Sequence, residues 1–221
     1  MMKRFIIKSH KHQSIPEEVV NALTHAIGAG LSVAALVLML IKAVHFGGGL
    51  RIASALIFGC ALIIMYSAST IYHSFQDKNV KKICRMLDHI SIYLLIAGTY
   101  TPVVLLVLNN TWGWSLFGVI WSIAILGIIF KLFFMGRFEI FSVLLYVGMG
   151  WVAVIGIGPL YHAMAHAGFV WLAIGGLCYT FGVVFYVLDG KMKYFHSIWH
   201  LFVLAGSISH FFMIYWYALP V

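Results

Sequence analysis

Long apolar segments follow one another along nearly the whole chain, with short polar stretches between them. A transmembrane helix needs about 20 apolar residues, and a helix hydrogen-bonds all of its backbone polar groups internally, as a bilayer requires. Seven segments meet this length: 19–44, 52–75, 83–108, 114–134, 138–161, 168–188 and 195–217. The pattern therefore predicts an all-α integral membrane protein, a bundle of seven transmembrane helices.

Composition agrees with this interpretation. Of the 221 residues, 63% are hydrophobic and only 9% are charged, whereas about 25% of an average soluble chain is charged. The connections are short, so consecutive helices are expected to be antiparallel. The segment after residue 16 is too long and too poorly bounded for a cleaved signal peptide. We therefore expect a short tail at 1–16 and a single transmembrane domain at 17–221.

The net charge of +8 is distributed unevenly between the two sides of the predicted bundle. Twelve of the 14 basic residues lie on one side: Lys3, Arg4, Lys8, Lys11, Lys78, Lys81, Lys82, Arg85, Lys131, Arg137, Lys191 and Lys193. The positive-inside rule then predicts a cytoplasmic N-terminus and an external C-terminus. Basic residues in these places set topology and meet anionic membrane lipids, so the charge does not indicate a nucleic-acid partner.

Four polar residues far apart in the sequence are expected at one depth. His73 ends the second span, Asp88 begins the third, and His196 and His200 begin the seventh. In an antiparallel bundle, all four lie within about 10 Å of the cytoplasmic boundary, at about 1.5 Å of rise per residue. Ionisable residues in a membrane are costly, and they commonly mark a functional site.

Helical spacing makes this layer a candidate zinc site. His196 and His200 are four residues apart and face the same way, as are Ser69 and His73. Three imidazoles from two helices can hold a tetrahedral zinc ion whose fourth position is open to water, which is typical of catalytic sites. Asp88 is then placed to orient the metal-bound water or accept its proton, and Ser69 to hydrogen-bond the water or an oxyanion.

Simpler interpretations stay open for these and neighbouring residues. A histidine in a helix bundle is usually a hydrogen-bond partner, and Asp88 can form an ion pair with Arg85. Asn21 and His25 begin the first span in the same layer. Either these two side chains contact the metal ligands from outside and hold them in place, or they make a packing contact between helices. His89 points about 100° away from Asp88 around the helix and is left out of the site.

Other polar and helix-breaking residues have expected roles outside the site. His162 and His166 are also four residues apart, but they lie in a predicted external loop. There they are either a solvated pair or a second metal site. His210 lies about 22 Å from the cytoplasmic face and is expected to make a hydrogen bond between helices. Pro102 is expected to kink the third span. Glycines of the fifth span are expected to allow close packing: Gly148, Gly150, Gly156 and Gly158.

The residues of the candidate site also carry a family resemblance. Ser69-Thr-Ile-Tyr-His73, Leu87-Asp88-His89 and His196-Ser-Ile-Trp-His200 together resemble the three-motif signature of the hemolysin III proteins. These proteins are the bacterial branch of the progestin and adiponectin receptor family, in a superfamily that includes alkaline ceramidases. The stretch Glu17-Glu18-Val-Val-Asn21-Ala-Leu-Thr-His25 resembles the start of bacterial members. The resemblance extends from about residue 17 to residue 217.

This resemblance implies a seven-helix bundle in the bacterial plasma membrane, with zinc near the cytoplasmic face. It implies that His73, His196 and His200 are the ligands, that Asp88 holds the metal-bound water and that Ser69 is the motif serine. The receptor branch has a long cytoplasmic N-terminal region. The short tail of this chain argues against a hormone-receptor function.

Four functional hypotheses remain at this point. The first is a zinc-dependent hydrolase of a lipid amide or ester, acting in membrane lipid homeostasis on a substrate from the inner leaflet. The second is a pore-forming cytolysin, which draws little support from a chain that is apolar throughout. The third is a sensor or receptor of membrane state with structural zinc, and the fourth is a protein that binds haem through two histidines. The sequence specifies neither the lipid nor the oligomeric state.

Overall fold

Seven helical spans form in the computed structural model, which describes residues 13–220. All seven predicted spans are confirmed, and no end differs from the prediction by more than five residues. The α-helices are α1 (Ile15–Phe46), α2 (Gly49–Ser74), α3 (Lys78–Pro102), α4 (Thr111–Phe134), α5 (Glu139–Gly150), α6 (Ile157–Ala163), α7 (His166–Val187) and α8 (Phe195–Met213). The basic residues predicted in the tail lie outside the described residues.

Polar residues at the helix starts explain where several helices begin. The side chain of Asp77 accepts hydrogen bonds from the backbone N–H groups of Asn79 and Val80, at 2.9 and 3.0 Å, and so caps α3. Asn110 caps α4 in the same way through the N–H of Gly113, at 3.0 Å. These contacts satisfy backbone donors that the first turn of a helix leaves without partners.

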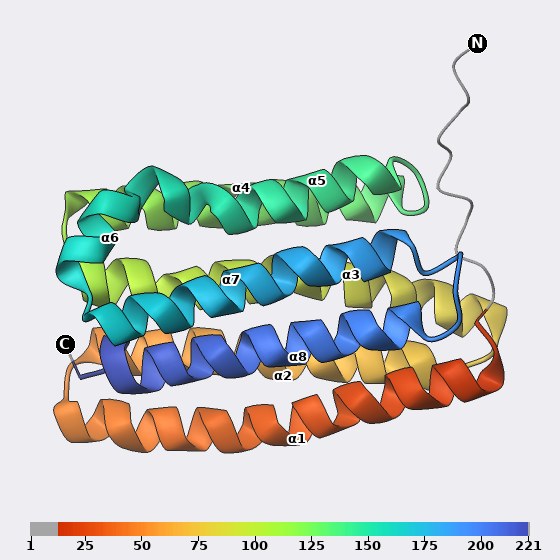
Figure 1. The fold of residues 1–221 in the computed structure, drawn as a ribbon, viewed down its shortest axis with the longest axis horizontal. Helices are drawn as coiled ribbons and strands as arrows, with labels where there is room; N and C mark the ends of the chain where they lie inside the picture. The colour runs from red at the N-terminus through yellow and green to blue at the C-terminus, as the bar shows by residue number, and fades with distance from the viewer. Residues whose placement is uncertain (1–12, 221) are drawn as a thin grey trace, which may run out of the picture.

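The helices run lengthwise through the bundle, with α1 along one edge and α4 and α5 along the other (Figure 1). The span that contains α3 is the most buried, with 72% of its most apolar 18-residue window inside the protein, and so α3 is the central helix. The chain enters and leaves at opposite ends of the bundle (Figure 1). We call the end that holds residues 75–77, 135–138 and 188–194 the basic end. The positive-inside rule predicts that it faces the cytoplasm.

The third span changes its winding at Pro102 and continues as a π-helical segment, Val103–Leu108. Proline has no N–H, so one hydrogen bond of the α-helical ladder is missing at this point. The wider turn lets the span continue to the far end of the bundle. All six residues of the π-helical segment are buried.

The fifth span is less regular than its sequence predicts. It is an α-helix to Gly150, a 3₁₀ segment at Trp151–Gly156, and then α6. The expectation that its glycines allow close packing is wrong for three of the four, because a Cβ atom on Gly148, Gly150 or Gly158 would meet nothing within 4 Å. Only at Gly156 would a Cβ atom meet a neighbour.

Close contact between α1 and α2 brings the polar residues of α1 to the site. A Cβ atom on Gly28 would lie 2.5 Å from the ring of Tyr66, so only glycine lets the two helices approach this closely. The hydroxyl of Tyr66 donates a 2.7 Å hydrogen bond to Ser207 on α8. Both residues are buried, and together they tie α1, α2 and α8 into one unit.

Candidate metal centre

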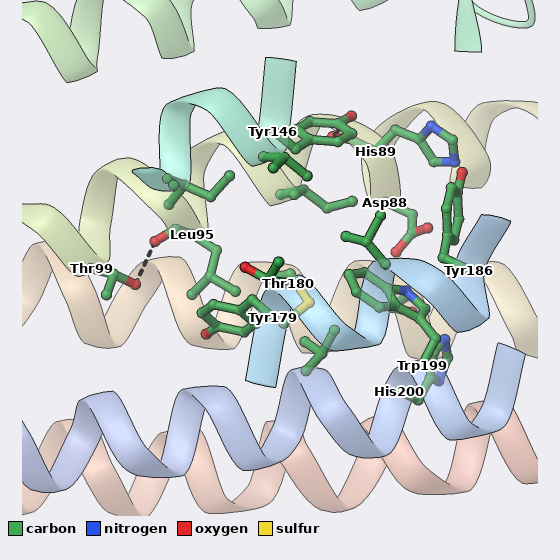
Figure 2. Close-up of a pocket in the computed structure, with 18 of the residues that line it drawn as sticks. Asp88, His89, Leu95, Thr99, Tyr146, Tyr179, Thr180, Tyr186, Trp199 and His200 are labelled. Atoms are coloured by element: carbon green, nitrogen blue, oxygen red, sulfur yellow. Dashed lines mark hydrogen bonds between the residues drawn. The ribbon is translucent and has the colours of Figure 1, made fainter. Parts of the chain in front are cut away.

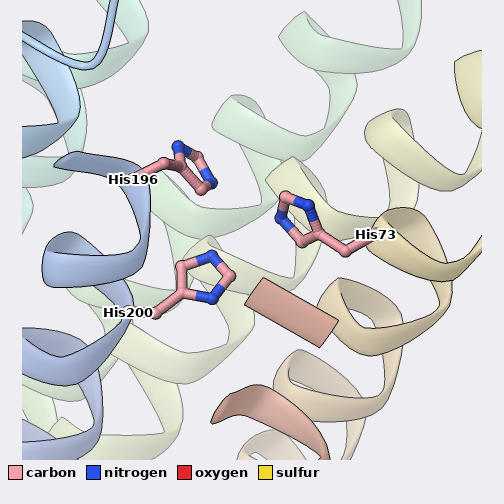
Figure 3. A group of neighbouring side chains, drawn as sticks. All are labelled: His73, His196 and His200. Atoms are coloured by element: carbon pink, nitrogen blue, oxygen red, sulfur yellow. The ribbon is translucent and has the colours of Figure 1, made fainter. Parts of the chain in front are cut away.

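Three histidines converge at the basic end, as the sequence predicts. His73 comes from α2, and His196 and His200 come from α8; one ring nitrogen of each lies within 4.8 Å of those of the other two (Figure 3). Their ring centroids are 4.8–5.1 Å apart. His73 and His200 are buried and His196 is half-buried. Among residues 13–220, this is the only group of three or more His, Cys, Asp or Glu side chains with this geometry.

Glu18 on α1 determines which nitrogen of His73 faces the centre of this group. Its Oε2 atom lies 2.6 Å from Nδ1 of His73, and its Oε1 atom accepts a 2.6 Å hydrogen bond from Nζ of Lys81. A carboxylate only accepts hydrogen bonds, so Nδ1 of His73 carries the proton and Nε2 has a free lone pair. This Nε2 atom is buried and has no hydrogen-bond partner among residues 13–220.

The other two histidines are held by Nδ1 as well. Nδ1 of His196 lies 3.2 Å from Oδ2 of Asp189, and Nδ1 of His200 lies 3.2 Å from the backbone oxygen of Asn21. The hydroxyl of Thr24 also lies 3.2 Å from Nδ1 of His200. Because these carboxylate and carbonyl oxygens only accept hydrogen bonds, Nδ1 donates in both rings and Nε2 is the available ligand atom.

This donor set fits zinc. Zinc in proteins is commonly bound by three neutral imidazoles, and metal-binding histidines almost always donate their second N–H to a carboxylate or a backbone carbonyl. The three histidines show this arrangement. The buried Nε2 atom of His73, left without a hydrogen bond, costs free energy unless an ion or a water molecule pairs with it.

Helix α1 forms the wall behind His200. The ring of His25 stacks on that of His200, with centroids 3.6 Å apart and planes 10° apart. The side-chain oxygen of Asn21 accepts a 2.6 Å hydrogen bond from Ser197 on α8. Neither ring nitrogen of His25 has a hydrogen-bond partner in the part of the chain that the structure describes. Both residues, for which the sequence left two roles open, therefore contact helix α8 at the candidate metal centre.

The sequence interpretation missed three residues that hold the histidines, namely Glu18, Thr24 and Asp189. Glu18, Asn21 and His25 are spaced i, i+3, i+7, which places them on one face of a helix, so the spacing alone carried a signal for Glu18. Asp189 precedes α8 in a connection whose path the sequence pattern does not define.

Asp88 and Ser69 line a cavity that also touches His196 and His200, and its volume is about 810 Å³. Asp88 comes from α3 and lies at the same end of this cavity as Tyr186 and His200 (Figure 2). Asp88 is half-buried and Ser69 is buried. The predicted roles of Asp88 and Ser69 remain predictions, and the structure places both in the lining of the cavity that His196 and His200 also line.

The other histidines are separated from the three. His89 directs Nδ1 towards Glu139, with 3.8 Å between Nδ1 and Oε2. His162 and His166 are exposed and both contact the ring of Tyr161 at the opposite end of the bundle. No third ligand of the four types joins them within the described residues.

Within the described residues, His210 does not make the expected hydrogen bond between helices. Its ring packs against Tyr179, with centroids 5.4 Å apart, and over Gly175, where a Cβ atom would lie 2.6 Å from the ring. Its Nδ1 atom is buried without a hydrogen-bond partner. The His210 ring therefore fills the space that a side chain at Gly175 on α7 would occupy, and this packing contact replaces the expected hydrogen bond.

Comparison with known proteins places the chain in a family. A family model described as Haemolysin-III related matches residues 13–211. The Hemolysin-3 homolog of Bacillus subtilis (strain 168) is 44% identical over 208 residues, covering 94% of this chain and 97% of that protein. Hemolysin-3 of Bacillus cereus is also 44% identical, covering 94% of each chain.

A more distant relative links the chain to animal proteins. The human Monocyte to macrophage differentiation factor is 29% identical over 169 residues, covering 74% of this chain and 70% of that protein. This likeness agrees with a relationship to the progestin and adiponectin receptor family. The chain, with its seven membrane-spanning helices, belongs to the Haemolysin-III related family and is a multi-pass bacterial membrane protein.

Proposed function

We propose that His73, His196 and His200 bind zinc and that the protein hydrolyses a lipid amide or ester, with a role in membrane lipid homeostasis. One observation carries the proposal: three neighbouring histidines are each held through Nδ1, and two of them, His196 and His200, line a cavity together with the carboxylate of Asp88. A purely structural zinc site is normally closed by a fourth protein ligand, and no fourth His, Cys, Asp or Glu joins this group in residues 13–220.

The cavity suits a molecule with a polar end and a long apolar chain. Charged and polar side chains line it at the basic end, and Leu95, Val103 and Leu172 line it further away. Its volume of about 810 Å³ lies within the range of about 300–1,000 Å³ that is typical of ligand pockets. The apolar walls bind an acyl chain and exclude bulk water, so the polar carbonyl group of a lipid is held near the histidines.

Each residue of the centre has a defined part in this chemistry. Bound zinc would polarise the substrate carbonyl and make water a stronger nucleophile. Asp88 would accept the proton of the attacking water and pass it to the leaving group. Ser69 would donate a hydrogen bond to the developing oxyanion. Glu18 and Asp189 keep His73 and His196 in the tautomer that presents Nε2. We expect the substrate to enter laterally from the inner leaflet, because the polar end of the cavity lies at the basic end.

The proposal is tested with purified protein, metal analysis and a lipid turnover assay. His200→Ala is expected to lose both bound zinc and turnover, whereas Asp88→Asn is expected to keep zinc and lose turnover. The matched control is His166→Ala, which removes one histidine of the other i, i+4 pair and should change neither readout. Unchanged turnover in a zinc-free His200→Ala protein would contradict the proposal.

A pore-forming cytolysin is the alternative that the family name suggests. Most residues that line the cavity are apolar, whereas a water-filled pore needs a polar lining. Dye leakage from liposomes separates the two functions. We expect the wild type to cause no leakage, because the proposed centre acts on lipids rather than on permeability. Equal leakage through the wild type and His73→Ala would favour a pore that does not depend on zinc.

A further inference from the structure

Basic residues of α3 line the mouth of the cavity at the basic end. Lys78, Lys82 and Arg85 are spaced i, i+4, i+7, so they lie on one face of the helix, and all three line the cavity. Asp88 continues the same helix by one further turn towards the histidines. The mouth and the candidate metal centre are thus adjacent parts of one space.

Membrane topology alone does not explain this placement. The positive-inside rule requires basic residues at the cytoplasmic end but does not specify what they face. Arg137, Lys191 and Lys193 lie at the same end of the bundle, and none of them lines the cavity. The basic residues at the mouth are therefore a subset directed towards the ligand space, and the others offer a matched control.

The mouth carries an excess of positive charge. Among its charged lining residues, four are basic and two are acidic: Lys78, Lys81, Lys82, Arg85, Glu18 and Asp88. Lys81 is paired with Glu18, at 2.6 Å. Within residues 13–220, the exposed side chains of Lys78 and Lys82 form no ion pair. Arg85 contacts Glu139 through Nη2 at 3.4 Å, and its Nε atom is buried without a hydrogen-bond partner. An anion at the mouth would pair with these groups.

The cavity continues from this mouth as an apolar channel. Its lining on α3 and the π-helical segment extends from Asp88 to Val104. The 16 steps from Asp88 to Val104 correspond to about 24 Å along the helix axis, a large part of a hydrocarbon core that is about 30 Å thick. A ligand that fills the space has an anionic head at the mouth and an acyl chain in the channel.

We propose that the ligand is an anionic glycerophospholipid or its monoacyl form. Its phosphate contacts Lys78, Lys82 and Arg85, and its acyl chain occupies the channel. Arg85 and Asp88 are three residues apart, about 4.5 Å along the helix axis, and a glycerol backbone can bridge a phosphate at the first to an ester carbonyl at the second. This proposal deepens the proposed hydrolase function and rests on it for the identity of the cleaved bond.

Binding of non-hydrolysable lipids to the purified, detergent-solubilised protein tests the head group. The probes are ether-linked monoacyl phosphatidylglycerol and phosphatidylcholine with the same chain, measured by isothermal titration calorimetry. We expect the wild type to bind the anionic lipid about tenfold more tightly, since each lysine near an anionic lipid contributes modestly to binding. Lys78→Gln/Lys82→Gln should lose this preference. The control Lys191→Gln/Lys193→Gln, which removes the same charge outside the cavity, should keep it.

Two results would overturn the proposal. Equal affinity of the wild type for both head groups would show that the mouth does not recognise an anion. An equal loss of preference in the control variant would show that only the overall surface charge matters. Inorganic phosphate is titrated as a separate probe. If it binds as tightly as the anionic lipid, the mouth takes free phosphate and not a lipid.

Turnover of the corresponding ester lipid is measured separately. Head-group preference without turnover would support the binding site and contradict the hydrolase. Turnover without head-group preference would support the hydrolase and contradict the anionic substrate. The two proposals can therefore fail independently.

Discussion

Glu18 on α1 holds His73 on α2 through a contact of 2.6 Å between Oε2 and Nδ1. The same carboxylate binds Lys81 at the start of α3 through its other oxygen, also at 2.6 Å. One buried side chain thus connects three helices at the candidate metal centre. Carboxylates in this position orient the imidazole and make it a stronger ligand.

Glu18→Gln is expected to weaken zinc binding about tenfold, the low end of the effect of such partners. The amide keeps the shape of the side chain but loses the charge that holds the proton on Nδ1 of His73. Competition with a chelator measures the zinc affinity. Asp77→Asn, a change of an exposed carboxylate that caps α3, is the control and should leave the affinity unchanged. Equal affinities of Glu18→Gln and wild type would contradict the role of Glu18.

His25→Phe separates a packing role of His25 from a role as a ligand. His25 stacks on His200, and its ring nitrogens have no hydrogen-bond partner, so phenylalanine keeps the contact and removes only the nitrogens. We expect bound zinc to be retained at the wild-type ratio. His25→Ala should instead lower the free energy of unfolding by about 2–4 kcal/mol, because it leaves a cavity beside the ligand. Loss of zinc from the phenylalanine variant would identify His25 as a ligand.

Glu139→Ala is expected to destabilise the protein by about 3 kcal/mol, because it leaves the buried ammonium group of Lys131 without its partner. Lys131 is 0% exposed, and its Nζ atom lies 2.9 Å from Oε2 of Glu139. Thermal unfolding in detergent measures the change. The double variant Lys131→Met/Glu139→Ala should recover much of the lost stability, because it removes the stranded charge. A double variant as unstable as the single one would contradict this explanation.

Gly28→Ala tests the close approach of α1 to α2. The added Cβ atom would lie 2.5 Å from the ring of Tyr66, so the helices must move apart, and we expect a loss of about 1–3 kcal/mol in stability. The control is Gly30→Ala, two residues along the same helix, where a Cβ atom meets nothing within 4 Å. This control should be neutral or slightly stabilising. Similar effects of both changes on thermal unfolding would argue against the packing explanation.

Hydrophobic pattern and chain direction were sufficient to predict the seven spans and the depth of His73, His196 and His200. Span length follows from bilayer thickness, and depth follows from counting residues along antiparallel helices. The same argument placed His162 and His166 at the opposite end. Irregular winding in the fifth span was not predictable, because its apolar sequence fits an α-helix as well as the 3₁₀ segment at Trp151–Gly156.

Residue spacing along the chain predicts which residues share a layer, but the packing of the helices sets which of those residues are in contact. Depth does not define how a helix is rotated about its axis or which helix is its neighbour. The rotation of α1 brings Glu18 to His73 and His25 to His200, and the path of the connection before α8 brings Asp189 to His196. These contacts depend on close packing at positions such as Gly28, where the absence of a side chain allows two helices to meet.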